Sequence, residues 1–153
     1  MPTLYMLVGV PGAGKTTWLN KQDININDYI VGSDYIIQEV ADYFGMTYTE
    51  AFPHLIKFAE YVMYKEIEDA CNKSCDIYWD QTNTTRKARD EKLSKIPIHY
   101  RKVAVYFAIP DNLEERLASR PGKKIPEHVV DSMVSNLEMP TIAEGFDDII
   151  HVQ

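Results

Sequence analysis

The sequence has little cysteine, no long apolar run and no internal repeat, and these absences exclude several classes of protein. Two cysteines among 153 residues argue against a secreted fold held by disulfides. No apolar run approaches the roughly 18 residues that cross a bilayer, and residues 1–4 do not resemble a secretory signal. We therefore expect one globular domain over residues 1–153, with no membrane partner, in the cytoplasm of the producing or host cell.

The two cysteines, Cys71 and Cys75, lie four positions apart, between a predicted helix and the next predicted strand. A disulfide or half of a metal site is compatible with this spacing, but no second pair of cysteines or histidines completes a zinc pattern. We expect both residues to be buried, reduced thiols.

The net charge of −7 argues at first against a nucleic-acid partner, but the charges are unevenly distributed. Eleven of the sixteen basic residues and only five acidic ones lie in residues 84–124, a local balance of +6. The rest of the chain carries five basic and eighteen acidic residues, a balance of −13. Such a split favours one face built for anions, although a chance run of solvated lysine and arginine is the simpler alternative.

Strands and helices alternate along the sequence. Short apolar runs predict strands at residues 4–8, 29–31, 77–79, 103–108 and 149–152. Helices are expected from Lys15, at 36–44, 50–73 and 86–95, up to Leu117, and from Pro126. Asp111 and Glu114 resemble the capping pair of the helix that ends at Leu117. The alternation predicts an α/β fold, with a parallel sheet of about five strands, helices on both faces and ligands at the carboxyl ends of the strands.

A glycine-rich motif directly follows the first predicted strand. It matches the pattern G-x4-G-K-[ST] and consists of Gly9, Val10, Pro11, Gly12, Ala13, Gly14, Lys15 and Thr16. Glycines let consecutive backbone N–H groups approach phosphate oxygens, and the start of the following helix adds partial positive charge. Lys15 is suited to the β- and γ-phosphates of a nucleoside triphosphate, and the Thr16 hydroxyl is suited to Mg²⁺. A purely structural glycine-rich turn is the alternative.

Two aspartates follow the second and third predicted strands. A carboxylate at the position of Asp34 can orient an acceptor hydroxyl and accept its proton, but Asp34 or Ser33 can also simply cap the next helix. Asp80 ends the third strand, where a carboxylate often supports Mg²⁺ through water. Turn formation with Thr82 and Asn83 is the alternative for Asp80.

A basic segment over residues 116–126 has the composition of a mobile lid. Arg116 and Arg120 are one helical turn apart, and Pro121-Gly122-Lys123-Lys124 follows as a candidate hinge or turn. Guanidinium groups on such a segment can close over a triphosphate and stabilise charge on the transferred group. A solvated helix end that pairs with the helix dipole is the alternative.

Together these segments resemble the phage-type polynucleotide 5′-hydroxyl kinases, within the wider P-loop kinase group that includes zeta-toxin-like and small-molecule kinases. The similarity covers nearly the whole chain. It is carried by residues 9–18, Ser33-Asp34, residues 80–83, residues 116–126, Pro140 and residues 144–149. The lid favours the polynucleotide kinases over other members, because Arg116 and Arg120 both fall in register with it.

The resemblance implies an ATP-dependent (or other NTP-dependent) and Mg²⁺-dependent phosphotransferase with a P-loop kinase fold. It implies that Asp34 is the general base and that Lys15 and Arg120 contact the transferred phosphates. Thr16 would serve Mg²⁺, with Asp80 predicted beside it. The nucleotide-binding residues expected from the motif and the resemblance are Gly9, Pro11, Gly12, Ala13, Gly14, Lys15, Thr16, Thr17, Arg116 and Arg120.

One position departs from the family pattern. Polynucleotide kinases usually carry an arginine three residues after the catalytic aspartate, where it holds the phosphate on the 3′ side of the acceptor, and here that residue is Ile37. Either another basic residue binds this phosphate, with Lys87, Arg89 and Lys123 as candidates, or the acceptor has none.

The leading interpretation is a kinase that phosphorylates the 5′-hydroxyl end of DNA or RNA. A polynucleotide is then the expected partner, and nucleic acid repair is the expected process. A small-molecule kinase that acts on a nucleoside, a sugar or an antibiotic is the second interpretation, favoured by Ile37 and by the acidic balance. A nucleotide-binding switch or ATPase without an acceptor is the third, and it leaves Asp34 and the lid arginines without a role.

Overall fold

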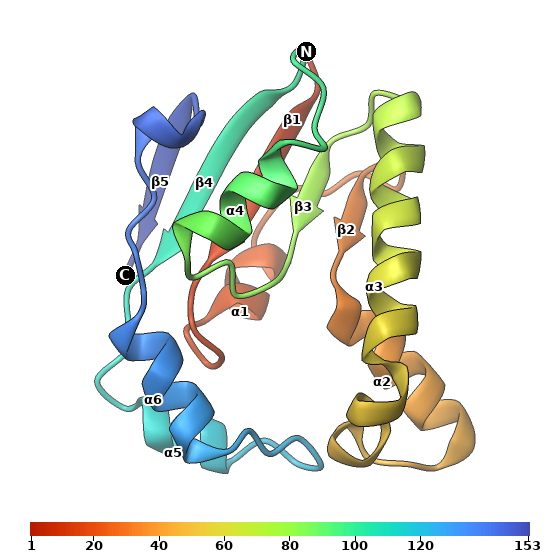
Figure 1. The fold of residues 1–153 in the computed structure, drawn as a ribbon, viewed down its shortest axis with the longest axis vertical. Coiled ribbons are helices and arrows are strands. Elements are labelled where there is room, and N and C mark those ends of the chain that lie inside the picture. Colours follow the sequence, from red (N-terminus) through yellow and green to blue (C-terminus); the bar gives the residue numbers. More distant parts are fainter.

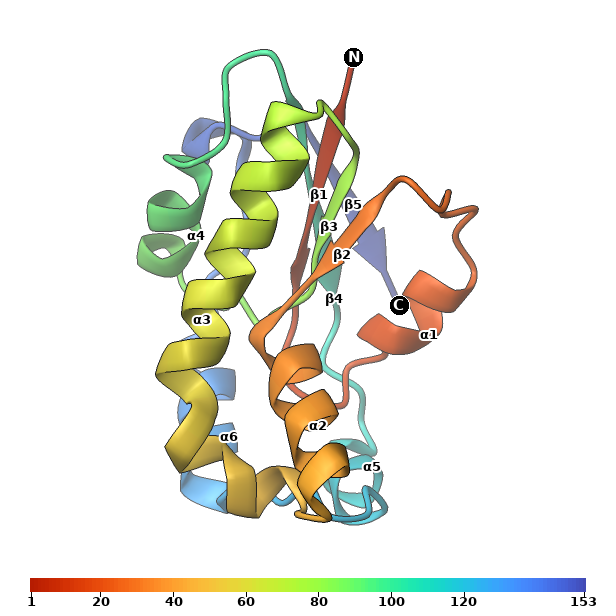
Figure 2. The same ribbon diagram turned by 90° about the vertical axis from the view of Figure 1, so that its right-hand side faces the viewer.

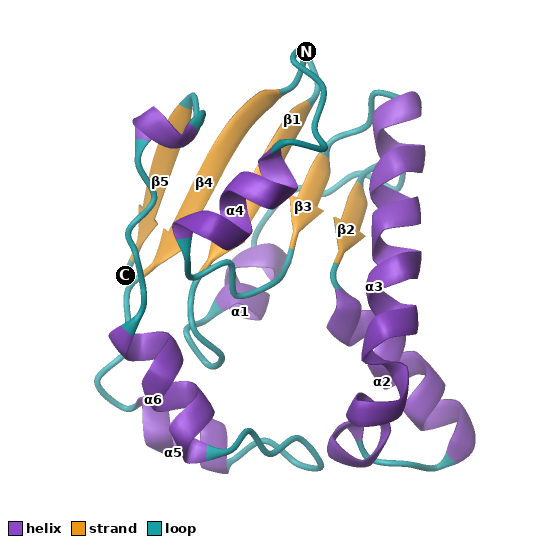
Figure 3. Cartoon of the chain, viewed as in Figure 1, coloured by secondary structure: helices purple, strands orange, loops and turns teal.

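The computed structural model describes all 153 residues and contains one five-stranded sheet. The strands are β1 (Thr3–Val8), β2 (Tyr29–Val31), β3 (Ile77–Trp79), β4 (Arg101–Phe107) and β5 (Asp148–Val152). They lie in the order β2-β3-β1-β4-β5, and every neighbouring pair is parallel, with Leu4 opposite both Ile77 and Lys102. All strands therefore end at the same edge, where loops lead into the next helices (Figure 3). The expected five-stranded parallel sheet is confirmed.

Helices cover both faces of the sheet, as expected. One face carries α1 (Lys15–Asn20), and the other carries α3 (Tyr48–Asn72) and α4 (Arg86–Leu93) (Figure 2). At the carboxyl end of the strands lie α2 (Ser33–Phe44), α5 (Leu113–Ala118) and α6 (Glu127–Ser135), with α2 separated from α5 and α6 along this end (Figure 1). A short 3₁₀ helix, η1 (Ile142–Glu144), precedes β5.

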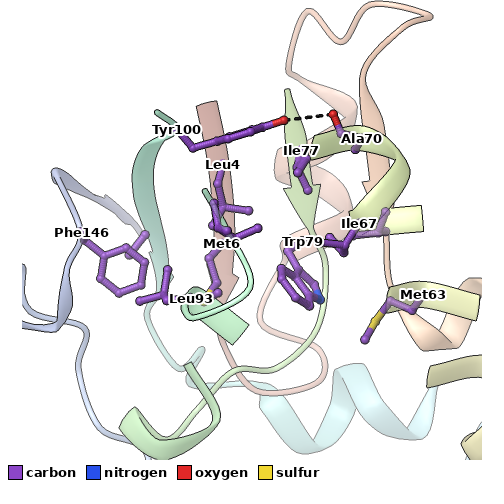
Figure 4. Close-up of a cluster of buried hydrophobic side chains, with 13 residues drawn as sticks. Leu4, Met6, Met63, Ile67, Ala70, Ile77, Trp79, Leu93, Tyr100 and Phe146 are labelled. Atoms are coloured by element: carbon purple, nitrogen blue, oxygen red, sulfur yellow. Dashed lines mark hydrogen bonds between the residues drawn. The ribbon is translucent and has the colours of Figure 1, made fainter. Parts of the chain in front are cut away.

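A hydrophobic core lies on each face of the sheet. The larger of the two cores lies between the sheet and the helices α3 and α4. Alternate residues of each strand point into it, as the two-residue period of a strand requires. Its buried members are Leu4, Met6, Val31, Met63, Ile67, Ala70, Ile77, Trp79, Leu93, Ile96, Tyr100, Ala104 and Phe146. Figure 4 draws these side chains and labels ten of them, with the Tyr100 hydroxyl donating a hydrogen bond of 3.1 Å to the Ala70 carbonyl. This bond satisfies a polar group that would be costly to bury alone.

The opposite core, beneath α1, contains four aromatic side chains that contact one another, Tyr5, Trp18, Tyr78 and Phe107. Tyr5 and Tyr78 stack with ring centroids 4.7 Å apart, and Trp18 from α1 meets Phe107 edge-on at 6.0 Å. Offset and edge-to-face contacts are the favoured arrangements of aromatic rings. Trp18 thus holds the short α1 against the sheet, and the loop that precedes α1 is held with it.

Two helix starts differ from expectation. The helix at Leu113 has Asn112 as its N-cap without a side-chain cap hydrogen bond, so the predicted capping pair of Asp111 and Glu114 is wrong. The helix begins one residue later than the capping pattern requires. Asp111 is therefore not the N-cap and Glu114 is not the N3 residue. A capping box that we did not predict starts α3, where the Thr47 side chain accepts from the Glu50 N–H and Glu50 accepts from the Thr47 N–H.

The basic segment of residues 84–124 does not form one face, so that expectation is wrong. Arg89 is fully buried and forms a bidentate ion pair with Glu144, at 2.7 and 3.1 Å. Lys92 lies over the Trp79 ring, and burial lowers its pKa to about 8. Arg101 begins β4 at the opposite end of the sheet from α5 and α6 (Figure 1). The segment therefore contributes to the carboxyl edge at two separate places, between β3 and α4 and after β4.

Cys71 and Cys75 are free thiols that are each partly exposed, so the expectation of full burial is wrong for both. The Cys75 carbonyl accepts a hydrogen bond of 2.6 Å from the Tyr100 hydroxyl. None of the helices is both long and apolar enough to span a membrane.

Candidate active site

The glycine-rich motif forms the loop between β1 and α1, as expected. Gly12 and Gly14 have φ angles of 82° and 102°, in the left-handed region where a side chain would be strained. The Gly9 N–H donates to the Thr82 carbonyl at 2.9 Å, which fixes the start of the loop to the end of β3. A methyl group on Gly9 would lie 3.0 Å from the Phe107 side chain, so this position has no spare room. The loop is therefore a tightly supported backbone turn.

Lys15 is the first residue of α1, and its side chain folds over the loop. Its ammonium group donates hydrogen bonds to the carbonyl oxygens of Gly9 and Val10, at 2.9 and 3.0 Å. Burial lowers the pKa of Lys15 to about 8, against the opposing effect of the nearby Asp80 carboxylate. The charge of Arg120 also lowers this pKa, and the charge of Asp34 raises it.

Asp34 lies in the first turn of α2, and its two carboxylate oxygens have different partners. Oδ1 accepts from the Tyr48 hydroxyl at 2.5 Å, and Oδ2 accepts from the Lys123 ammonium at 2.8 Å. The N-cap of α2 is Gly32, and no side chain caps this helix, so the capping alternative for Asp34 and Ser33 is wrong. Burial raises the pKa of the Asp34 carboxyl, but the two hydrogen bonds outweigh it and hold that pKa below its ordinary value.

Asp80 follows β3 and faces the same space. Its carboxylate accepts a hydrogen bond from the Tyr35 hydroxyl on α2, and its N–H donates to the Val31 carbonyl at 2.7 Å. Burial raises the pKa of Asp80, against the lowering effects of Tyr35 and Lys15. The carboxylate therefore reaches across to α2 and towards Lys15, which does not fit the alternative that Asp80 only forms a turn with Thr82 and Asn83.

Arg116 lies on α5, and Arg120 follows the C-cap of that helix. The Arg116 guanidinium donates to the Gly12 carbonyl at 3.2 Å. The Nη1 atom of Arg120 is buried and has no hydrogen-bond partner. A buried guanidinium nitrogen without an acceptor is costly, and an oxyanion is the acceptor that matches it best.

The loop of residues 119–126 connects α5 to α6. Between these helices it extends across the carboxyl end of the strands as far as the start of α3 (Figure 1). Its backbone is fixed there, because the Thr49 N–H donates to the Gly122 carbonyl at 3.3 Å and the Lys124 N–H donates to the Thr49 hydroxyl at 2.9 Å. The Lys123 ammonium lies 4.3 Å from the centre of the Tyr48 ring. The predicted lid segment thus contacts Asp34 through Lys123, while the Asp34 side chain stays 53% exposed.

The residue three positions after Asp34 points away from the site. Ile37 is fully buried and packs with Ala41, Ala51 and Ala59 between α2 and α3, so it faces away from the site. Arg89 is occupied by Glu144, and Lys87 is an exposed residue of α4. Of the three basic candidates, only Lys123 contacts Asp34.

Three functional neighbours escaped the sequence analysis: Tyr35, Tyr48 and Gln81. Gln81 accepts from the Trp79 indole at 3.2 Å and donates to the Ser33 hydroxyl at 3.0 Å, which ties the end of β3 to the start of α2. No sequence pattern predicts the contacts of Tyr35 and Gln81, because their partners are 45 and 48 positions away. For Tyr48, a signal was present: the Thr47–Glu50 capping box places it in the first turn of α3.

A triphosphate and Mg²⁺ fit the donors and acceptors of this region. Lys15, the loop N–H groups and the unpartnered Arg120 Nη1 would be the phosphate ligands, while Pro11, Ala13 and Thr17 lie within or directly after the loop. The Thr16 residue is exposed, and a cavity of about 360 Å³ beside it is lined by Leu19, Asn20, Ile30 and Tyr35. The chain contains no cluster of three or more His, Cys, Asp or Glu residues suited to a metal. A site that keeps several waters, as Mg²⁺ prefers, needs no such cluster.

Comparison with known proteins identifies the family. Residues 4–140 match the family AAA_33, which is described as an AAA domain. The chain belongs to this family. Two curated relatives, heterogeneous nuclear ribonucleoprotein U-like protein 2 from Homo sapiens and from Mus musculus, are 23% and 24% identical over 158 residues. The alignments cover 97% of this chain and 21% of each relative, so the chain spans about a fifth of their length.

Solved structures share the fold of this AAA-family chain. A kinase-like protein from Chloroflexus aurantiacus superposes with a TM-score of 0.71 at 16% identity, over 99% of this chain and 87% of that one. A chain of the Pnkp1/Rnl/Hen1 RNA repair complex superposes with a TM-score of 0.68 at 20% identity, over 89% of this chain and 44% of that one. At these identities the similarity establishes a P-loop kinase-like α/β fold.

Proposed function

We propose that this chain is an ATP- and Mg²⁺-dependent kinase that transfers the γ-phosphoryl group to the 5′-hydroxyl end of a polynucleotide. The observation that carries the proposal is the convergence of Lys15, Arg120 and the Asp34 carboxylate at one edge of the sheet. The AAA family and the kinase-like fold support phosphoryl transfer, and the similarity to a chain of an RNA repair complex supports a nucleic-acid acceptor.

The proposed reaction is an in-line transfer between two oxygen atoms. The acceptor oxygen forms a bond to the γ-phosphorus, the bond from that phosphorus to the bridging oxygen of ATP breaks, and ADP leaves. Asp34 accepts the proton of the acceptor hydroxyl, while Lys15 and Arg120 neutralise charge on the transferred group.

Mg²⁺, held by the Thr16 hydroxyl and through water by Asp80, would supply further positive charge at the phosphates. The Tyr35 hydroxyl fixes the direction of the Asp80 carboxylate, and the Tyr48 hydroxyl does the same for Asp34. These tyrosines therefore position the two carboxylates before either ligand binds.

A small-molecule kinase is the second candidate, and the burial of Ile37 favours it. Without an arginine at that position, a neutral nucleoside, sugar or antibiotic would meet no cation from α2. Such an enzyme would show no dependence on oligonucleotide length and little dependence on salt, whereas a polynucleotide acceptor should show both.

The deciding experiment measures transfer from γ-labelled ATP to a 5′-hydroxyl oligonucleotide. A free nucleoside and free sugars at matched concentration are the competing acceptors. We expect labelled oligonucleotide that requires Mg²⁺ and disappears with Asp34→Ala, while the variant still binds ATP. Absence of label on the oligonucleotide, together with label on a small molecule, would replace this proposal with the second candidate.

A further inference from the structure

The strand β1 loses one of its two neighbours before it reaches the phosphate-binding loop. Its pairing with β3 ends at Met6, opposite Trp79, while its pairing with β4 continues to Val8. Gly9, the first residue of the loop, then donates to the Thr82 carbonyl at 2.9 Å. Between Met6 and Gly9, β1 therefore depends on contacts with the segment that follows β3.

The side chain of Asn83 makes such a contact. Its Nδ2 atom donates a hydrogen bond of 2.8 Å to the carbonyl of Leu7, which lies 76 positions earlier in the chain. Its Oδ1 atom accepts a hydrogen bond from the ammonium group of Lys92 on α4. Asn83 is only 2% exposed, so loss of either bond would leave a buried polar group without a partner. One amide thus joins β1 to α4 beside the start of the loop.

Few other residues meet the requirements of this position. Asn83 has a φ of 47°, in the left-handed region that asparagine adopts more readily than most residues other than glycine. Its amide also donates and accepts at the same time, as the Leu7 carbonyl and the Lys92 ammonium require. An ionised aspartate has the same shape but no donor for the Leu7 carbonyl.

The backbone of Asn83 is held independently of its side chain. Its carbonyl accepts a hydrogen bond of 2.9 Å from Arg89 Nη1, and Arg89 is itself paired with Glu144. The carbonyl of the next residue, Thr84, accepts from the Glu138 N–H at 2.8 Å. Removal of the side chain should therefore leave the path of the chain in place and delete only the link between β1 and α4.

We propose that Asn83 is a positioning residue for the donor nucleotide: its amide takes the place of a missing strand residue beside β1 and so fixes the phosphate-binding loop in the conformation that binds ATP. Asn83 acts through the Leu7 carbonyl and does not touch the nucleotide. The loop N–H groups must point at the phosphates before ATP arrives, so a shift at the start of the loop weakens binding. The inference needs nucleotide binding and is independent of the acceptor.

Asn83→Gly is the first test, because glycine adopts this φ without strain and has neither side-chain bond. Calorimetry with ATP and Mg²⁺, without an acceptor, should give a Kd roughly tenfold higher than that of the natural sequence. Amide hydrogen exchange should rise more at Gly9 than at Val105 in the middle of β4, because the opening is local. A general loss of stability would instead raise exchange equally at both amides.

Three further variants separate the two side-chain bonds and control for the glycine. Asn83→Asp keeps an acceptor for Lys92 but loses the donor to Leu7, so ATP should again bind at least roughly tenfold more weakly. Lys92→Met leaves the amide on Leu7, and we expect at most about a threefold effect. Ser74, between α3 and β3, is the other non-glycine residue with a positive φ, at 52°, and Ser74→Gly should bind ATP like the natural sequence.

The outcomes separate this inference from the proposed function. A folded Asn83→Asp variant that binds ATP like the natural sequence would overturn the inference, and so would equal rises in exchange at Gly9 and Val105 in Asn83→Gly. If Asn83→Gly does not fold, the variant of matching shape, Asn83→Asp, decides alone. ATP binding as expected without labelling of any 5′-hydroxyl oligonucleotide would refute the proposed acceptor and leave this inference standing. If the natural sequence does not bind ATP, both fail.

Discussion

Substitution of Gly32 by alanine offers a sharp test of how the two carboxylates are positioned. Gly32 links β2 to α2, and its φ of 177° is extended backbone that any residue adopts. A Cβ atom at this position would lie 2.3 Å from the backbone oxygen of Asp80. The requirement for glycine is therefore steric and comes from a neighbouring strand.

The size of the effect follows from that contact. Real Cβ contacts are essentially never shorter than 3.0 Å, so the two backbones have to separate by at least 0.7 Å. The Asp80 N–H bond of 2.7 Å to the Val31 carbonyl opposes the separation. Overpacking of this kind costs about 1–3 kcal/mol of unfolding free energy. A misplacement of about 1 Å in a catalytic group can cost about 10²-fold in rate, and Gly32 lies beside both Asp34 and Asp80.

The assay pairs thermal unfolding with transfer from γ-labelled ATP to a 5′-hydroxyl oligonucleotide, and Gly45→Ala is the matched control. Gly45 ends α2 at a φ of 68° with nothing within 4 Å of an added Cβ, so alanine there costs about 1–2 kcal/mol of backbone strain without a clash. We expect similar losses of stability but a loss of rate for Gly32→Ala alone. A folded Gly32→Ala variant with a rate within threefold of the natural sequence would refute the positioning argument.

Four other predictions test the site and its support. Asp34→Asn should keep ATP affinity within about twofold and lower the rate of phosphoryl transfer roughly 10²- to 10⁴-fold. A smaller loss of rate in single-turnover assays would show that Asp34 is not the general base. Arg120→Met should slow transfer by about 10³-fold, and an unchanged rate would show that its unpartnered nitrogen does not serve the transferred phosphate. Because the pKa of Lys15 is lowered to about 8, its ammonium form is lost above that pH, and ATP affinity should fall by up to about tenfold per pH unit. Calorimetry should detect proton uptake on ATP binding. Lys15→Met should abolish both the pH dependence and the proton uptake. Glu144→Gln leaves the Arg89 guanidinium buried without a carboxylate and should cost about 3–5 kcal/mol in urea unfolding; a loss below about 1 kcal/mol would contradict the importance of this ion pair.

Much of the sheet and part of the site could be predicted from local sequence. The strands β1 and β3 are short apolar runs followed by Gly9 and by Asp80, and parallel strands end at one edge. Asp34 and Asp80 could therefore be placed at the same edge as the loop of residues 9–16 without knowledge of the strand order. The glycine-rich motif was equally readable, because Gly12 and Gly14 adopt backbone angles that other residues avoid.

The helix ends were less predictable, because capping depends on one residue of register. Asp111 and Glu114 have the right spacing, yet α5 begins one residue later and uses Asn112. The pair Thr47 and Glu50 has the same spacing and does form a capping box. The spacing to the glutamate is the same in the two places, although the first residue is Asp111 in one and Thr47 in the other, so spacing alone does not fix the residue at which a helix begins.

By itself, the sequence determined the phosphate-binding loop, the two acidic strand ends and the parallel α/β class, since each depends on residues that are neighbours in the chain. The tertiary structure alone decided that Lys123 pairs with Asp34 across 89 positions and that Arg89 is buried against Glu144 across 55. Such contacts are fixed by the strand order and by the path of the 119–126 loop, and no local period or motif encodes either. The basic residues after β3 therefore cannot be told apart in the sequence, although Arg89 stabilises the fold and Lys123 forms an ion pair with the proposed base, Asp34.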